Sequence, residues 1–517
     1  MSYHLLTLTF VLILATLTFS FSYVAFNSIL PKAQFKRWLS YWYIVTLIVF
    51  FAGNFWLYIL VCGLYLIYIS KREENIFALY FFLLLVIPPF DQVIPVPGIN
   101  HLFPMNYPRL LSLTLLLPLF LSQLSKKDKI PYGSTGADKL VLAIVSLTFL
   151  LWLRGTTLTD AVRYGLSGFL DVFLPYYTAS RVIKNISQLR TVMLAFIMGC
   201  LITGIIGIFE YKTSWLLYNN LDESLGISWF MGSYLGRGGD LRALASTGQP
   251  IILGYVVMVA LGFYLFIARS IKSKIVRISG FIILGAASFV TLSRGPWVGS
   301  VALIIIFLAT GTNVARKFII LLIVAIFALP TLKVVPGGNK IINILPFIGT
   351  SEQFNVDYRD KLLDRSLIII SNHPMFGVFD PRKEPEMADM VQGEGIVDIV
   401  NSYLGIVLSQ GLIGLTLFLW FFALVLRITY KAMKKLPKNS DEHLCGSSLL
   451  ASLTGVLVSI YTVSTILVIP IIYWSLAGLM LSYSRIIKLT NNNILGTKDL
   501  TTETTQSYYP TTLVRKK

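Results

Sequence analysis

Long apolar runs separated by short polar stretches dominate the pattern of this chain. The runs are about 17–25 residues long, which is the length of helix that crosses the hydrocarbon core of a bilayer. Because a helix satisfies its backbone hydrogen bonds within one segment, these runs predict a transmembrane helix bundle. Outer-membrane barrels instead alternate over segments of about 10 residues, and the chain does not follow that pattern. The predicted fold is all-α and polytopic, with about 13–15 helices.

The apolar runs place all predicted helices in a single membrane domain, 1–486. Their ranges are 5–26, 40–53, 55–70, 74–90, 107–124, 137–153, 158–178, 190–209, 250–270, 276–293, 296–311, 315–333, 401–426, 447–466 and 470–486. The second and third are short and meet at Gly53-Asn54, which leaves the count open. The first run lacks a basic start and a clear cleavage site, so we expect a retained helix.

Three segments of the chain fall outside this helical pattern. Two connections are long, at about 210–250 and 334–400, and we expect the second to contain short helices. Neither is long enough or apolar enough to form a large independent domain. The segment 487–517 is Thr-rich and has no apolar periodicity from Asn491 onward, so it is predicted to be a disordered tail.

Charge gives the orientation of the predicted bundle. Only 13% of the residues are charged, whereas soluble domains have about 25%. The net charge of +18 could indicate nucleic-acid binding, but the Lys and Arg residues lie in short loops between apolar runs. These loops fall on one side when the helices alternate, as the positive-inside rule requires of the cytoplasmic side. Both long connections are therefore predicted to be extracytoplasmic and the tail cytoplasmic, with no nucleic-acid partner.

The residues that usually bind metals are few and scattered. Cys62, Cys200 and Cys445 are far apart within or beside apolar segments, and the chain has four histidines. This matches no metal-site or disulfide pattern. We therefore predict neither a metal nor another cofactor.

Arginines on the predicted outer side are the first functional candidates, because the positive-inside rule disfavours an idle cation there. Arg294 comes just before Pro296, which suits the first turn of a helix, so it would stand at a helix N-terminus, a natural anion site. The alternative is an arginine snorkelling to the interface. Arg242 lies in a segment of small residues ahead of helix 250–270, and the alternative for it is an exposed loop.

The longer connection contributes two further arginines. Arg359 and Arg365 precede the apolar stretch 366–370, which suits an amphipathic helix that lies on the bundle and ends before Pro374. Each arginine could point into a membrane cavity or into water.

Two arginines on predicted membrane helices have a specific local context. Arg163 has Asp160 and Asp171 nearby, so an internal ion pair is expected. Arg109 follows a proline at a helix start, and we predict an interfacial anchor there.

Acidic and imidazole groups of the outer side are the remaining candidates. Glu394 and Asp398 lie just before helix 401–426, where Asp398 or Asn401 could serve only as the helix cap. His373 is solitary, and a solvated histidine is the alternative to a functional role.

Several of these residues belong to segments that resemble the O-antigen ligase and Wzy-type polymerase superfamily. The segments are Ser293-Arg294-Gly295 before an apolar helix, Arg359 followed by His373-Pro374-Met375-Phe376-Gly377-Val378, Asn401-Ser402-Tyr403-Leu404 followed by Gly411-Leu412-Ile413-Gly414, and Arg242 with the Gly-x-Pro of Gly248 to Pro250. Together they cover about 230–425. Their order and their shared outer side make the set more specific than any one motif.

The chain departs from the ligase pattern at one position. Ligases of this superfamily carry a histidine immediately before the asparagine of the third segment, where it is interpreted as the catalytic base. Here that position is Val400, and Asp398 stands three residues before Asn401. The departure favours the polymerase branch over the ligases.

The resemblance implies a glycosyltransferase of the bacterial inner membrane. It would join undecaprenyl-diphosphate-linked oligosaccharide repeat units into O-antigen or exopolysaccharide at the outer face, without a metal. The expected diphosphate-binding residues are Arg242, Arg294, Arg359 and Arg365, and the expected base is Asp398, then Glu394 or His373.

The expected partners are the lipid-linked oligosaccharide, membrane lipid and a chain-length regulator protein. Two alternatives remain open. One is a ligase that transfers glycan to lipid A or protein. The other is a flippase, in which charges should lie near the bilayer midplane.

Overall fold

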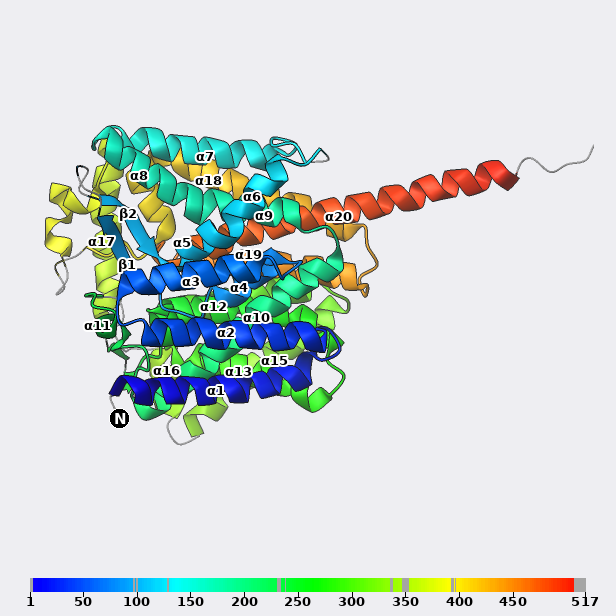
Figure 1. Cartoon of the computed structure of the whole chain (residues 1–517), viewed down its shortest axis with the longest axis horizontal. Coiled ribbons are helices and arrows are strands. Elements are labelled where there is room, and N and C mark those ends of the chain that lie inside the picture. The colour runs from blue at the N-terminus through cyan, green and yellow to red at the C-terminus, as the bar shows by residue number, and fades with distance from the viewer. Residues whose placement is uncertain are drawn as a thin grey trace, which may run out of the picture.

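Figure 1 shows the computed structural model of the chain as a single bundle of helices lying side by side. The structure describes residues 3–95, 98, 101–127, 130–229, 234–237, 239–334, 338–345, 353–391, 395 and 397–505. Within these residues helices predominate, and the strands are confined to two short antiparallel hairpins. The prediction of an all-α membrane protein is confirmed at this level.

Among the described residues, the first half of the chain contributes eleven α-helices. They are α1 (Tyr3–Phe26), α2 (Lys32–Phe51), α3 (Phe55–Ser70), α4 (Ile76–Leu83), α5 (Tyr107–Leu111), α6 (Leu117–Leu124), α7 (Gly136–Trp152), α8 (Leu158–Gly168), α9 (Leu174–Val182), α10 (Ile186–Thr213) and the short α11 (Leu221–Ser224). The hairpin of β1 (Asp91–Pro95) and β2 (His101–Asn106) leads into α5.

The second half begins with the small hairpin of β3 (Gly236–Arg237) and β4 (Asp240–Leu241). Its helices are α12 (Pro250–Ile267), α13 (Lys274–Val290), α14 (Arg294–Thr310), α15 (Val314–Val334), α16 (Gly338–Ile344), α17 (Gln353–Asn372), α18 (Ser402–Lys434), α19 (Asp441–Ser459) and α20 (Val468–Thr505). Because α16 and α17 fall in the long connection 334–400, the prediction of helices there is confirmed.

Helix length and composition support a membrane protein. Among the described residues, five helices are long and apolar enough to cross a bilayer: His4–Phe26, Tyr107–Leu124, Ile186–Thr213, Pro250–Ser270 and Ser402–Lys434. Two shorter helices, Phe55–Ser70 and Arg294–Thr310, are also apolar. The larger predicted number of spans stays a prediction.

Several helix boundaries differ from those predicted, including the start of α2 and the ends of α18 and α19, and two of them have a clear physical reason. Helix α4 ends at Leu83 instead of residue 90, and the chain turns ahead of Pro88-Pro89, since proline cannot donate the next helical hydrogen bond. Helix α20 continues to Thr505 instead of ending near residue 486. Adding residues to a helix that is already nucleated costs little, so part of the segment predicted as a tail is helical. Residues 506–517 lie outside the described residues.

Two predicted helices contain a π-helical turn. Helices α5 and α6 are joined through Ser112–Leu116, and α8 and α9 through Phe169–Phe173. A proline stands two residues after the end of each turn, Pro118 in α6 and Pro175 in α9. Because proline lacks an N–H and clashes with the preceding carbonyl, the wider turn allows the helix to continue past it.

The core of the bundle is built around α10. This helix packs against α4, α12, α13 and α1, and most of its residues are buried. A helix that is apolar on all sides suits a position enclosed by other helices. Nearby, α14 and α19 approach closely where Gly299 faces Gly455, because neither position has a side chain to keep the backbones apart.

The two ends of the bundle differ in character. The N-terminus, α11, α17 and the β1–β2 hairpin lie at one end in Figure 1, whereas the last part of α20 projects beyond the other end. The N-terminus and the long connection therefore share one end, as the predicted topology requires. That this end is extracytoplasmic stays a prediction.

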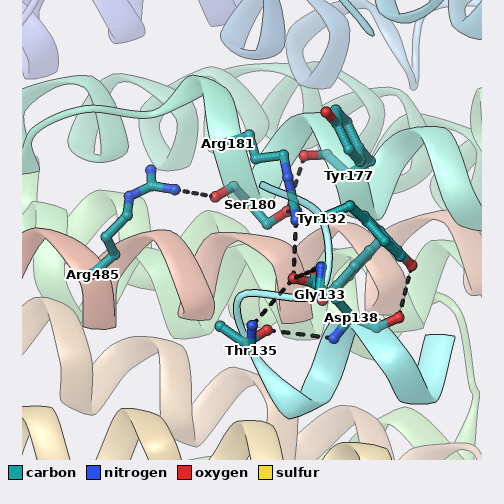
Figure 2. Close-up of polar contacts among 9 residues, drawn as sticks. Tyr132, Gly133, Thr135, Asp138, Tyr177, Ser180, Arg181 and Arg485 are labelled. Atoms are coloured by element: carbon teal, nitrogen blue, oxygen red, sulfur yellow. Dashed lines mark hydrogen bonds and ion pairs between the residues drawn. The ribbon is translucent and has the colours of Figure 1, made fainter. Parts of the chain in front are cut away.

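A buried ion pair between α7 and α9 belongs to a polar network that also includes α20 (Figure 2). Arg181 of α9 donates to Asp138 of α7 at 3.0 Å, and both side chains are buried. The guanidinium also lies 4.4 Å from the centre of the Tyr177 ring. Arg485 of α20 donates to the Ser180 carbonyl at 2.6 Å. Because the partners come from α7, α9 and α20, this network fixes how these helices meet.

Candidate functional site

Arg294 is the first residue of α14, as predicted. Its Nε donates to the Ile344 carbonyl at 2.8 Å and its Nη2 to the Asn343 carbonyl at 3.3 Å. These carbonyls lie at the C-terminal end of α16, where the helix dipole favours a cation. The half-buried guanidinium is thus held in place by protein groups, which argues against a freely snorkelling arginine.

Arg242 and Arg237 hold the turn just ahead of α14. Arg242 donates to the Thr291 carbonyl at 3.2 Å and to the Ser293 hydroxyl at 3.0 Å. Arg237 donates to the Leu292 carbonyl. Leu292 has a φ of 47°, in the left-handed region that side chains disfavour, so these bonds help to stabilise a strained turn.

Arg359 reaches the same place from α17. Its Nη2 donates to the Thr462 carbonyl at 3.4 Å. Thr462 packs against the first turn of α14 so closely that a Cβ on Gly295 would lie 2.2 Å from the Thr462 hydroxyl. The contacts of Arg242 and Arg359 therefore fall on Thr291, Ser293 and Thr462, next to the first turn of α14, where Arg294 itself begins the helix and bonds to the end of α16. We call residues 291–295 with Thr462 the arginine turn.

Asp398 is attached to the connection 460–467, which also carries the Thr462 acceptor of Arg359. Its Oδ1 accepts a hydrogen bond from the Ser464 hydroxyl at 2.7 Å, and the side chain is half-buried. Only one residue separates Ser464 from Thr462. The carboxylate is thus bonded to the same short connection as Arg359.

Of the two residues expected to cap α18, Asp398 and Asn401, Asn401 forms the cap. The Asn401 side chain accepts from the backbone N–H groups of Tyr403 and Leu404, at 3.0 and 3.2 Å. The Asp398 carboxylate does not cap α18. Tyr358 further fixes this segment, since its hydroxyl donates to the Asp398 carbonyl at 3.1 Å.

The remaining predicted site residues are placed differently. Arg365 pairs with Asp389 at 2.7 Å, and both side chains are largely exposed. This contact keeps the Arg365 side chain within the long connection 334–400, which we call the outer connection after its predicted side. His373 is exposed immediately after α17. Glu394 lies outside the described residues.

The segment 374–378 docks into a kink of α18. The Val378 N–H donates to the Leu408 carbonyl at 2.7 Å, and the Leu412 N–H to the Pro374 carbonyl at 2.8 Å. Gly377 and Gly411 have φ values of 60° and 68°. A Cβ on either would lie about 2 Å from backbone atoms of the other segment. These two motif glycines therefore serve the architecture, since only glycine fits both the dihedral angle and the space.

Arg154, which the sequence analysis missed, clamps this docked segment. It donates to the carbonyls of Gly377 and Phe376, both at 3.0 Å, and to the Ser409 carbonyl at 3.3 Å. Partial burial lowers the pKa of this guanidinium. The sequence held one signal for a role of Arg154. It is a cation on the predicted outer side, where the positive-inside rule disfavours one without a function.

A cavity of about 1000 Å³ opens beside the docked segment. It lies among α7, α8, α18 and α20, with the β2–α5 region and residues 379–383 completing its wall. Asn401 and Ser464 are in the lining, so the partner of Asp398 contacts this space. Within the described chain, the lining does not include Arg242, Arg294 or Arg359. The arginine turn and the cavity are thus separate features linked by the connection 460–467.

Three ion pairs of the described residues line the cavity, among them Lys383 with Asp380 at 3.1 Å. Arg163 pairs with Asp160, which confirms the expected internal ion pair. Arg109 pairs with Asp171 at 2.8 Å, so the prediction of an interfacial anchor at Arg109 is wrong. Asp171 lies in the π-helical turn, and the two residues are 62 positions apart. Their pairing depends on tertiary packing.

Comparison with known proteins assigns part of the chain to a family. Residues 279–419 match the family model described as O-antigen ligase. No curated protein matches the chain. The matched range includes Arg294, Arg359 and the docked segment 374–378 with its α18 kink. The resemblance to the O-antigen ligase and Wzy-type superfamily is therefore confirmed, and the chain carries an O-antigen ligase family segment from residue 279 to 419.

Proposed function

We propose that this protein polymerises undecaprenyl-diphosphate-linked oligosaccharide repeat units into a surface polysaccharide. The observation that carries the proposal is that Arg242 and Arg359 contact the arginine turn, where Arg294 begins α14, and that Asp398 is bonded to the connection 460–467 that carries Thr462. These residues come from separate parts of the chain. The family match supports polysaccharide chemistry for this region.

The arginine turn suits the leaving group of such a reaction. When the bond between the anomeric carbon and the diphosphate breaks, its electron pair stays on a phosphate oxygen, where negative charge develops. Cations that are already fixed in position stabilise that charge most effectively. Arginine is suited to this role, because it stays charged and offers two parallel donors to phosphate oxygens.

Asp398 suits the other half of the reaction. The oxygen of an acceptor hydroxyl forms the new bond to the anomeric carbon, and its proton passes to the Asp398 carboxylate. Its Oδ1 is bonded to Ser464, so the group is oriented, and the half-buried side chain is still reachable. A general base must lie within hydrogen-bonding reach of the proton that it removes.

A polymerase fits this sequence better than a ligase of the standard type. The position of the ligase histidine is Val400, which cannot carry a proton. Asp398 is the nearby group that can. The proposal therefore has a second lipid-linked repeat unit as acceptor, with a chain-length regulator protein as the expected partner.

Deleting the gene and separating the surface polysaccharide on a gel tests the proposal. Loss of long chains, with single repeats still attached to their carrier, is the expected result. Complementation with the intact gene should restore the ladder. A deletion strain whose chains have normal length would overturn the polymerase assignment, and loss of single repeats from the acceptor would indicate a ligase.

Orientation can be tested separately by cysteine labelling. The proposal places the arginine turn at the outer face of the bacterial inner membrane. Ala388 is exposed in the same outer connection, so Ala388→Cys should react with an impermeant maleimide in intact spheroplasts. Lys431→Cys, near the end of α18 in a predicted cytoplasmic loop, is the matched control and should react only after lysis. The reverse pattern would contradict the proposed orientation.

A further inference from the structure

One wall of the cavity carries an aromatic pair, of which one ring is exposed and the other is partly buried. Trp152, the last residue of α7, stacks on Tyr164 of α8 with ring centres 3.4 Å apart and planes 17° from parallel. Both rings line the cavity. Tyr164 is 48% exposed, although aromatic residues normally bury their surface. An open aromatic surface inside a concave site is typical of a ligand contact.

The loop after the docked segment holds this aromatic pair in position. The Phe379 ring meets Trp152 edge-on, at 5.1 Å and 90°. Phe379 in turn packs on Gly155, where a Cβ would lie 2.3 Å from the ring. The Trp152 ring is therefore held between Tyr164 and Phe379. A surface fixed in this way loses little conformational entropy when a ligand binds.

Polar groups lie beside the aromatic pair on α8, the helix that carries Tyr164. Asp160 and Arg163 precede Tyr164 by four and one positions and line the cavity with it. They form an ion pair, and the Thr157 hydroxyl also donates to Asp160 at 2.9 Å. The wall thus combines a flat apolar surface with a charged donor and a charged acceptor, which can bind hydroxyl groups through charge-assisted hydrogen bonds.

We propose that the wall formed by Trp152, Tyr164, Asp160 and Arg163 is a carbohydrate subsite that binds one six-membered sugar ring. Such a ring has a flat C–H face, which packs on the aromatic pair, and a rim of hydroxyl groups, which bond to the ion pair. This inference rests on the proposed function, because the ring would belong to the glycan being extended. The four residues lie outside the matched segment 279–419, so this wall is suited to select the glycan of this particular protein.

Binding of free oligosaccharide to the purified full-length protein tests the subsite. The probe is the one-repeat and two-repeat oligosaccharide released by partial hydrolysis of the host's own surface polysaccharide, which has no lipid and no diphosphate. Affinity is measured by titration calorimetry in lipid nanodiscs, and saturation-transfer NMR identifies the sugar protons that contact the protein. The wild type should bind, and Tyr164→Ala and Trp152→Ala should weaken binding about tenfold or more.

The control is a tryptophan away from the cavity. Trp420 of α18 is 60% exposed and does not belong to the described cavity lining, so Trp420→Ala should bind like the wild type. Because Tyr164 is already half-exposed, Tyr164→Ala should fold even if Trp152→Ala does not, and its melting curve checks this. Wild-type affinity in a folded Tyr164→Ala protein, or no binding by the wild type, would overturn the subsite.

Arg294→Lys separates this inference from the proposed function. It changes the arginine turn and leaves the cavity wall intact, so the subsite predicts wild-type affinity for the free oligosaccharide. Tyr164-dependent binding in a protein whose deletion leaves chain length normal would retain the subsite and reject the polymerase. Loss of polymer on deletion, without Tyr164-dependent binding, would reject the subsite alone.

Discussion

The arginine turn and the cavity wall use charged residues in different ways. At the arginine turn, Arg242 and Arg294 are fixed by carbonyl and hydroxyl oxygens of neighbouring helix ends. On the cavity wall, Arg109 and Arg163 are each paired with an aspartate. The first arrangement orients cations with neutral acceptors, whereas the second pairs these two cations with anions. A diphosphate needs the former, and a neutral sugar is suited to the latter.

The family match divides these two regions only in part. Arg294 and Arg359 lie inside the matched range 279–419, but Arg242 lies outside it. Of the cavity lining, Arg109 and Arg163 lie outside the range, whereas residues 379–383 lie inside it. A reaction common to many glycans requires the same leaving-group site in each enzyme, while each glycan requires its own recognition surface. The separation of chemistry and selectivity is therefore a hypothesis, which rests on the four wall residues outside the match. The following experiments test that separation, from the largest expected effect to the smallest.

Replacing the proposed base should have the largest effect. Asp398→Asn keeps the shape of the side chain but removes its basicity, so the transfer rate should fall by about 10²–10⁴. Because Asn401 caps α18, the fold should be unaffected. Polymer formation from purified lipid-linked repeats gives the rate. Asp389→Asn, in the same outer connection, is the control and should remain active. A normal chain-length profile for Asp398→Asn would remove Asp398 from the chemistry.

Changing the arginine turn should have a slightly smaller effect. Arg294→Lys retains the charge but loses the planar two-donor group, so the rate should fall by about 10²–10³. Arg269→Lys is a matched control at another position, since Arg269 also donates to a carbonyl, that of Asn439. If both variants polymerise equally well, the arginine turn does not bind the leaving group.

Replacing a glycine of the docked segment 374–378 should lower the stability of the protein. Gly377→Ala forces a Cβ to within 2.2 Å of the Leu408 carbonyl and strains a positive φ, which should cost about 2–4 kcal/mol. Gly226 has a φ of 70° and open space around it, so Gly226→Ala measures the strain alone, about 1 kcal/mol. Thermal unfolding in detergent compares them. Equal melting temperatures would show that the clash is relieved cheaply.

The smallest effect is expected at Arg365. Its pair with Asp389 is exposed on both sides, so Arg365→Lys should change stability by less than about 1 kcal/mol. Polymer length should also stay normal, because this contact holds the side chain within the outer connection. Reduced polymer with an unchanged melting temperature would instead place Arg365 at the diphosphate site.

Local patterns in the sequence were enough to predict several features of this fold. The position of Arg294 follows from Pro296 two residues later, and the Asp160–Arg163 pair follows from helical spacing. The apolar runs also gave most helices within a few residues. These features depend on neighbours along the chain, where the physical rules of helices act directly.

Features that depend on distant contacts could not be predicted. The Arg109–Asp171 pair requires the packing of two helices that each contain a π-helical turn. The roles of Gly377 and Gly411 require two backbones to cross. A glycine in a sequence shows that a strained or crowded position is possible, but it does not show which backbone passes there. The cavity has the same origin, because its lining comes from segments that are far apart in the sequence.

The clamp at Arg154 has a consequence for the order in which the protein is made. Its acceptors at Phe376 and Ser409 lie 222 and 255 residues further along the chain. At ordinary rates of synthesis the ribosome needs roughly 10–50 s to reach them. In the predicted topology the connection between α7 and α8 crosses the membrane before these acceptors are made, and its arginine would then contact water or lipid phosphates. The contacts of Arg154 can therefore form only after residues 376–409 have been synthesised. Until then the amino-terminal helices lack these hydrogen bonds.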